Sequence, residues 1–255
     1  EARLLAERRF ITCDVLKGRG ARGVYVSEDQ RLCIMINGRD HMRTRVQLAG
    51  IQTDEAWAQL NLMDDALAER VDYAFSDRLG YLTADLGALG TGLKASVLLH
   101  LPGLVLCNAL REHIETANNA RLLLHGVRPG GPPALEHEAP ESTNGEESLY
   151  TDTDGAVCCL AQETVGDLFL LVNQETLGVV EDEVVFQVGN AASSIVAAER
   201  AARERLLHDN PQELEDRVGR AAGIAGGARL MGFREAIDLW SSLRLGVAAD
   251  VLPGL

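Results

Sequence analysis

The sequence predicts an α+β fold in which helices flank an antiparallel β-sheet, because short strand-like runs come first and long helical stretches follow. Apolar and β-branched runs occur at 23–26, 31–36 and 43–49, and polar turn signals separate them. From about residue 181 the pattern is helical, with a proline break at Pro211. Strands followed by helices favour α+β over the alternating units of a parallel α/β sheet.

The middle of the chain supplies the remaining expected elements. They are a helix over 53–75, a strand over 95–101, a helix over 102–119, and strand-like runs over 120–127 and 156–174.

The first of these helices has an apolar stripe. Trp57, Leu60, Met63 and Leu67 recur at helical spacing, which predicts a face that packs into the core. Thr53 is the expected N-cap, with acidic residues in the first turn. Residues 129–154 have a different composition, acidic and rich in Pro, Gly and Ser, and are not expected to bury enough apolar surface to order.

The charge and the cysteines exclude several classes of protein. The formal net charge of −14 argues against a general nucleic-acid or anionic-membrane binder, because both attract basic surfaces. No apolar run reaches the length of a membrane span. The five cysteines form no C-x-x-C pair, so disulfide and zinc frameworks are not expected and a cytoplasmic location fits.

A glycine-rich segment, GALGTGLKASVLLHLP, begins at Gly87. Gly87 and Gly92 have the spacing of a Walker phosphate loop, but Lys94 is displaced from the position that such a loop requires. A strand, not a helix, is expected after Lys94. The segment is therefore not a Walker loop.

Three runs in order carry a stronger signal: SEDQRLCIMINGRDHMR, LGYLTADLGALGTGLKASVLLHLPGLV and NQETLG. Together they resemble the ATP:guanidino phosphotransferases (phosphagen kinases), in particular the bacterial protein arginine kinases. The resemblance implies a glutamine-synthetase-like catalytic domain over 1–205, with an insertion at about 129–156. Residues 211–255 resemble part of the small helical C-terminal domain of the arginine kinases. The family's S-S-R-I-R-L-A-R-N nucleotide segment has no counterpart in these residues.

The resemblance implies a reaction that moves the γ-phosphoryl group of ATP, with Mg²⁺, to a guanidino nitrogen of protein arginine. Cationic groups must neutralise the phosphates. The lysine at position 94 stands at an arginine of the family motif, and lysine lacks the bidentate fork of a guanidinium. The residues that the resemblance places at the nucleotide are Arg9, Arg43, Lys94, Ala95, Ser96, Val97, Leu98 and Arg128.

The guanidino side of the site departs from the family pattern. The family motif N-E-E-D-H reads Asn37-Gly38-Arg39-Asp40-His41, so Arg39 stands where a catalytic glutamate belongs. Asp85 replaces the family cysteine, and Glu163 matches the second glutamate. The resemblance therefore leaves Glu163 as a base, with Asp85 or Asp40 as candidates for the missing carboxylate.

Two interpretations of Arg39 remain open. In the first, its guanidinium occupies the vacated substrate position as a built-in pseudosubstrate between Asp85 and Glu163. In the second, the site has drifted and Arg39 is a tolerated strand residue. An arginine in a pocket for a cation repels the substrate by a few kcal/mol at intermediate dielectric, which is about the cost of like charges in contact.

Two classes of function follow. One is an ATP-dependent protein arginine kinase with impaired catalysis. The other is a non-catalytic pseudokinase that binds nucleotide, phosphoarginine or a regulatory protein partner. No partner nucleic acid or membrane is expected, and a homodimer is a family expectation. His41 and His100 lack partners at ligand spacing, so they predict structural histidines and no metal site.

Overall fold

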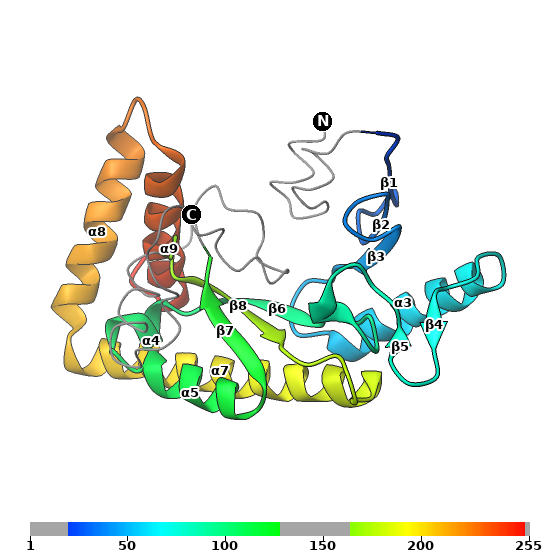
Figure 1. Cartoon of the computed structure of the whole chain (residues 1–255). Helices are drawn as coiled ribbons and strands as arrows, with labels where there is room; N and C mark the ends of the chain where they lie inside the picture. Colours follow the sequence, from blue (N-terminus) through cyan, green and yellow to red (C-terminus); the bar gives the residue numbers. More distant parts are fainter. Residues whose placement is uncertain (1–19, 128–163, 253–255) are drawn as a thin grey trace, which may run out of the picture. The chain divides into compact units, whose positions relative to one another are not determined.

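The computed structural model describes residues 20–127 and 164–252 (Figure 1). These residues form two compact units. Unit 1 comprises 20–97 and 172–190, and unit 2 comprises 98–127, 164–171 and 191–252. Within the described ranges, no helix combines the length and the apolar character needed to cross a membrane. The fold is α+β, with antiparallel sheets flanked by helices, as predicted.

The first sheet lies in unit 1 and consists of β1 (Gly23–Val26), β2 (Leu32–Ile36) and β3 (Met42–Val46) in that order. Both pairings are antiparallel. Cys33 and Met35 of β2 are buried while their neighbours are not, which is the two-residue period of a strand with one covered face. All three strands were predicted, although β3 ends three residues before the expected position.

Helix α3 (Thr53–Ala68) packs against β3. Trp57 and Leu60 contact a buried cluster of Leu93, Val184 and Val185, so this part of the predicted apolar stripe is confirmed. The helix is shorter than the predicted 53–75. The N-cap prediction is wrong, because Thr53 is the first helical residue and Gln52 precedes it with no side-chain capping bond.

A two-stranded hairpin that the pattern did not predict follows α3. It consists of β4 (Phe75–Ser76) and β5 (Gly80–Tyr81), which are too short to show an alternation. The Tyr81 N–H donates to the Gly90 carbonyl at 2.7 Å, and the Gly90 N–H donates back at 3.2 Å. A Cβ on Gly80 would lie 2.5 Å from the Gly90 oxygen, and one on Gly90 would collide with the Thr176 carbonyl. The glycines at these two positions therefore permit close backbone contact.

A second sheet has the order β6 (Ser96–His100), β8 (Leu168–Asn173), β7 (Leu122–Gly126). The Asn173 N–H donates to the Ala95 carbonyl, and the Leu101 N–H donates to the Asp167 carbonyl. These bonds at opposite ends make β6 and β8 antiparallel. Five of the six residues of β8 are buried, which explains its continuous apolar sequence.

The helix predicted over 102–119 is two helices in the structure. These are α4 (Pro102–Leu106) and α5 (Leu110–Asn119), and Asn108 between them adopts a left-handed φ of 52°. Asparagine adopts this conformation at little cost, so the helix can end here without a glycine or proline to mark the break. The apolar pattern of the sequence therefore continues across the break and reads as one helix. Helix α5 packs against β7 through its buried face.

Three long helices complete the described chain: α7 (Glu181–Asp209), α8 (Pro211–Gly227) and α9 (Phe233–Ala248). The break at Pro211 was predicted, but a second break after Gly227 was not. Helices α8 and α9 lie side by side (Figure 1), and their shared core contains Leu214, Val218 and Leu245. Helix α7 is divided between the two units.

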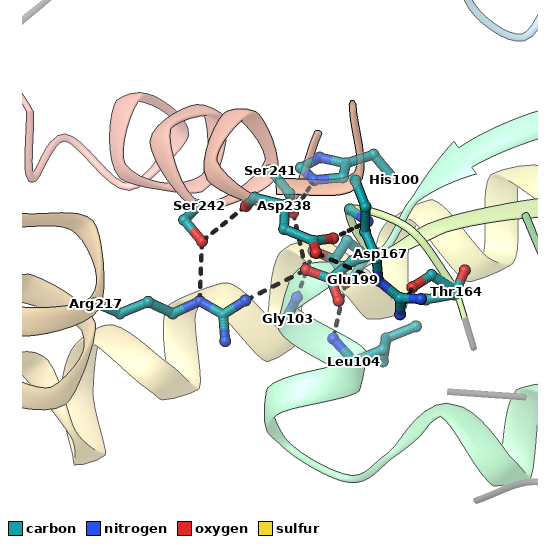
Figure 2. Close-up of polar contacts among 12 residues, drawn as sticks. His100, Gly103, Leu104, Thr164, Asp167, Glu199, Arg217, Asp238, Ser241 and Ser242 are labelled. Atoms are coloured by element: carbon teal, nitrogen blue, oxygen red, sulfur yellow. Dashed lines mark hydrogen bonds and ion pairs between the residues drawn. The ribbon is translucent and has the colours of Figure 1, made fainter. Parts of the chain in front are cut away.

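A buried carboxylate holds the first turn of α4 in unit 2. Glu199 is 3% exposed and accepts hydrogen bonds from the N–H groups of Gly103 at 2.9 Å and Leu104 at 2.8 Å (Figure 2). Pro102 has no N–H to satisfy. Arg203 donates to the same carboxylate at 2.6 Å. Burial raises the pKa of Glu199, although these three donors act in the opposite direction.

Candidate functional site

The altered family motif forms the turn of the hairpin between β2 and β3. The Asn37 N–H donates to the His41 carbonyl at 2.9 Å, and Asn37 has a φ of 56°. An asparagine tolerates this left-handed conformation, so the turn suits the local sequence. Arg39 and Asp40 therefore lie in a turn, and the description of Arg39 as a strand residue is wrong.

Arg39 forms an ion pair with Asp85. Its Nη1 lies 3.3 Å from Asp85 Oδ2, and the side chains are 34% and 12% exposed respectively. Asp85 is the N-cap of the 3-10 helix η1 (Leu86–Ala88), where its Oδ1 accepts a hydrogen bond from the Gly87 N–H at 3.1 Å. One oxygen of the Asp85 carboxylate thus accepts a hydrogen bond from the backbone, and the other contacts the Arg39 guanidinium.

Asp40 links the hairpin turn to two other parts of unit 1. Its Oδ1 accepts a hydrogen bond from the Ala84 N–H at 2.7 Å, and its Oδ2 lies 3.4 Å from Arg43 Nη2. Because Ala84 precedes Asp85, the two carboxylates fix the turn and the 84–85 segment against each other. Both oxygens of Asp40 are engaged in these contacts.

Lys94 is the third cationic side chain of the predicted site, after Arg39 and Arg43. Its Nζ donates to the carbonyl oxygens of Asn173 and Gln174, each at 3.3 Å. Burial lowers the pKa of Lys94; Asp85 opposes this shift and Arg43 adds to it. The charges of Asp85 and Arg43 therefore both act on the ammonium group of Lys94.

The structure thus brings five of the sequence-predicted residues into one polar cluster in unit 1: Arg39, Asp40, Arg43, Asp85 and Lys94. Ala95, Ser96 and Val97 continue the chain from Lys94. Leu98 is the first residue of unit 2 and is 47% exposed. Arg9, Arg128 and Glu163 lie outside the described residues, as does the 129–156 insertion. The functional roles of all twelve residues stay predictions.

Sequence reasoning missed two buried polar residues that hold the glycine segment. Asn173 is 3% exposed and bonds the backbone on both sides of Lys94. Thr176 is 4% exposed and donates to the carbonyls of Gly87 and Leu89. Polar residues after a buried strand were the available signal, but their partners are about 80 positions earlier in the chain.

His100 has a structural partner in unit 2. Its Nε2 lies 2.8 Å from Ser241 Oγ, and that hydroxyl donates to Asp167 Oδ2 at 2.8 Å (Figure 2). The serine has one hydrogen and gives it to the carboxylate, so the histidine Nε2 must carry the proton. The buried Nδ1 has no hydrogen-bond partner among the described residues. Burial, with Arg203 and Arg244, lowers the pKa of His100 to about 4.

We expect the stability of the chain to fall as pH decreases from about 6.5 to about 4, the unfolded and folded pKa values of His100. In this window the unfolded chain binds the proton and the folded chain does not, so acid favours unfolding. Because the ring is partly solvated, the expected loss is about 1–3 kcal/mol. Urea titrations at several pH values measure it.

A His100→Gln variant should lose this part of the pH dependence. The control is His208→Gln, which changes an exposed histidine at the end of α7. An unchanged slope between pH 4 and 6.5 in the His100→Gln variant would contradict the assignment.

The described residues contain no cluster of metal-ligating side chains. In 20–127 and 164–252, no group of three or more His, Cys, Asp or Glu side chains could hold a metal ion. No residue is therefore assigned to Mg²⁺.

Comparison with family models defines the class of protein. The model of the ATP:guanido phosphotransferase C-terminal catalytic domain matches residues 1–137. The chain belongs to the ATP:guanido phosphotransferase family. The model of the protein-arginine kinase McsB C-terminal domain matches residues 211–255. The boundary between a domain over 1–205 and one over 211–255 stays a prediction.

The relatives indicate the branch. A protein-arginine kinase of Pelotomaculum thermopropionicum is 36% identical over 255 residues, which cover 100% of this chain and 63% of the relative. A protein-arginine kinase of Bacillus subtilis is 32% identical over the same 100% of the chain, with 62% of the relative covered. The chain thus spans less than two thirds of the length of these relatives.

Solved structures show the same fold. The taurocyamine kinase of Schistosoma mansoni with bound transition-state analogue components matches with a TM-score of 0.55 at 19% identity, over 81% of this chain and 25% of that one. Lombricine kinase matches with a TM-score of 0.55 at 23% identity, over 78% of this chain and 50% of that one. At these identities the likeness concerns the fold alone.

Proposed function

We propose that this chain is a nucleotide-binding protein of the protein-arginine kinase type whose phosphoryl transfer to external arginine is impaired, because Arg39 occupies the guanidino position. The observation that carries the proposal is the Arg39–Asp85 ion pair at 3.3 Å. The names of the relatives indicate the substrate class, which is the arginine side chain of a protein.

The chemistry explains why such a contact would impair the reaction. Transfer breaks the bond between the γ-phosphorus and the ADP oxygen, forms a bond from phosphorus to a guanidino nitrogen, and moves one nitrogen-bound proton to a base. A guanidinium has a pKa above 12, so that base is essential. Arg39 cannot act as the base, and it repels a second guanidinium.

The two carboxylates near Arg39 are poor substitutes for the missing glutamate. Asp85 is engaged with Arg39 and the Gly87 N–H, and Asp40 is engaged with Arg43 and the Ala84 N–H. Because both oxygens of each carboxylate already take part in these contacts, neither is placed to accept a further hydrogen bond from an incoming guanidino N–H. This arrangement supports the pseudosubstrate interpretation over unconstrained drift.

The nucleotide side supports phosphate binding. Arg43 and Lys94 place two cations close together in a chain whose net charge is −14. A local group of cations is what the phosphates of ATP require. ATP would supply the transferable phosphoryl group, and Mg²⁺ is carried over from the resemblance alone. Arg43 and Lys94 would contact the phosphate oxygens. The single ammonium of Lys94 would replace the bidentate guanidinium that the family has at this position.

The proposal is tested with the full chain by calorimetric titration and by a transfer assay. We expect the unaltered chain to bind ATP and to form phosphoarginine on an arginine-containing protein only at a trace rate. We further expect N-acetylarginine amide to bind an Arg39→Ala variant and not the unaltered chain, because the variant vacates the position next to Asp85. Sustained phosphoarginine formation by the unaltered chain would overturn the proposal.

A matched control is Arg31→Ala. Arg31 is exposed and pairs with Asp29 outside the site, so its removal also subtracts one positive charge. We expect this variant to bind no N-acetylarginine amide. If it binds the ligand as well as Arg39→Ala does, the effect is one of general charge and not of a vacated position.

A further inference from the structure

Asn173, the last residue of β8, holds both peptide groups that flank Lys94. Its Oδ1 accepts a hydrogen bond from the Ala95 N–H at 2.9 Å, and its Nδ2 donates to the Leu93 carbonyl at 3.2 Å. The same Nδ2 also donates to the Glu175 carbonyl at 2.8 Å. A carboxamide has both an acceptor and two donors, so it can make all three bonds in one orientation only.

The backbone of Asn173 also contacts the lysine side chain. Two of the three ammonium donors of Lys94 are directed at the carbonyls of Asn173 and Gln174. The direction of the third is then set by these two contacts. One buried residue therefore fixes the main chain around Lys94 and part of the orientation of its ammonium group.

We infer that Asn173 is a positioning residue for the nucleotide phosphates: it aims the remaining N–H donor of Lys94 at a phosphate oxygen. The inference rests on the proposed function, which makes Lys94 a phosphate contact. A lysine on a flexible four-carbon chain needs such support where an arginine fork has been lost. Asn173 would act through Lys94 and touch no substrate.

A double-mutant cycle on ATP affinity tests whether Asn173 acts through Lys94. The variants are Asn173→Ala, Lys94→Ala and the pair, each titrated calorimetrically with ATP at fixed pH and salt. We expect each single variant to weaken binding about 10-fold, which is about 1.4 kcal/mol. The double variant should bind as Lys94→Ala does. Independent, multiplying losses would overturn the inference.

Ser242→Ala is the matched control. Ser242 is also a buried polar residue, and its hydroxyl donates to the Asp238 carbonyl at 3.2 Å within α9 of unit 2, outside the glycine segment. It should keep ATP affinity within about 2-fold and show no coupling to Lys94→Ala. If Asn173→Ala does not fold, Asn173→Ser replaces it, since its hydroxyl is too short to reach both flanking peptide groups.

A second measurement needs no nucleotide. The chain has two lysines, Lys17 and Lys94, so the acylation of each is readily followed by mass spectrometry. We expect Asn173→Ala to raise the acylation rate of Lys94 severalfold relative to Lys17, and Ser242→Ala to leave it unchanged. An unchanged rate in Asn173→Ala overturns the inference. Absence of ATP binding by the unaltered chain overturns the proposed function, while the acylation rates still decide whether Asn173 holds Lys94.

Discussion

A variant that carries Gly38→Glu, Arg39→Glu and Asp85→Cys is expected to form phosphoarginine on a test protein at least about 100-fold faster than the unaltered chain. The changes return the residues of the family motif to the guanidino side. They remove the repulsion between Arg39 and an incoming guanidinium, and they supply a carboxylate that can accept its proton. Acid-labile phosphate on arginine, measured by mass spectrometry with ATP and Mg²⁺, gives the rate.

Arg39→Ala alone separates the two parts of this effect. It opens the position next to Asp85 but adds no base, so we expect it to bind the arginine ligand without a comparable gain in rate. The idea that Arg39 blocks the chemistry fails if the unaltered chain already transfers phosphate as fast as the triple variant. Circular dichroism of each variant confirms that the fold is kept.

Glu199→Ala is expected to lower the free energy of unfolding by about 3–5 kcal/mol, which is the largest stability effect we expect in unit 2. The change removes the acceptor for the first N–H groups of α4 and leaves Arg203 with an uncompensated charge. A buried N–H group without an acceptor destabilises the fold, because it has given up its hydrogen bond to water and gained none in return. Urea unfolding followed by circular dichroism measures the loss.

The control for this variant lies on the same helix. Glu204→Ala removes an exposed carboxylate of α7 and should change the free energy of unfolding by no more than about 0.5 kcal/mol. A Glu199→Ala variant as stable as Glu204→Ala would show that the carboxylate does not hold α4. An intermediate loss in Glu199→Gln, which keeps one acceptor oxygen, is expected.

The strands and long helices were largely predictable because their signals are local. The apolar and β-branched runs of β2 and β8 identify strands without knowledge of their partners. The errors fall where the chain turns within an apolar stretch. The break at Asn108 and the hairpin β4–β5 have no periodic signal, because each involves only a few residues.

The site was predictable only as a set of residue types. The motif around Arg39 and the segment around Lys94 identify the family, and the replaced glutamate and cysteine are visible in the letters. The Arg39–Asp85 contact was a hypothesis that required two segments 46 positions apart to meet, and the structure contains that contact. Its role in catalysis stays a prediction.

The sequence by itself determined the family, the α+β class and the substitutions on the guanidino side, because these depend on residue identity and local spacing. Only the tertiary structure decided which charge pairs with which. The sequence offered both Asp85 and Asp40 as candidates for the missing carboxylate, and the structure pairs Asp85 with Arg39 and Asp40 with Arg43. The hydrogen bonds from the Asn173 side chain to the peptide groups that flank Lys94 likewise form only because β8 ends beside the start of β6. Such contacts depend on distance in space, which residue spacing along a chain does not specify.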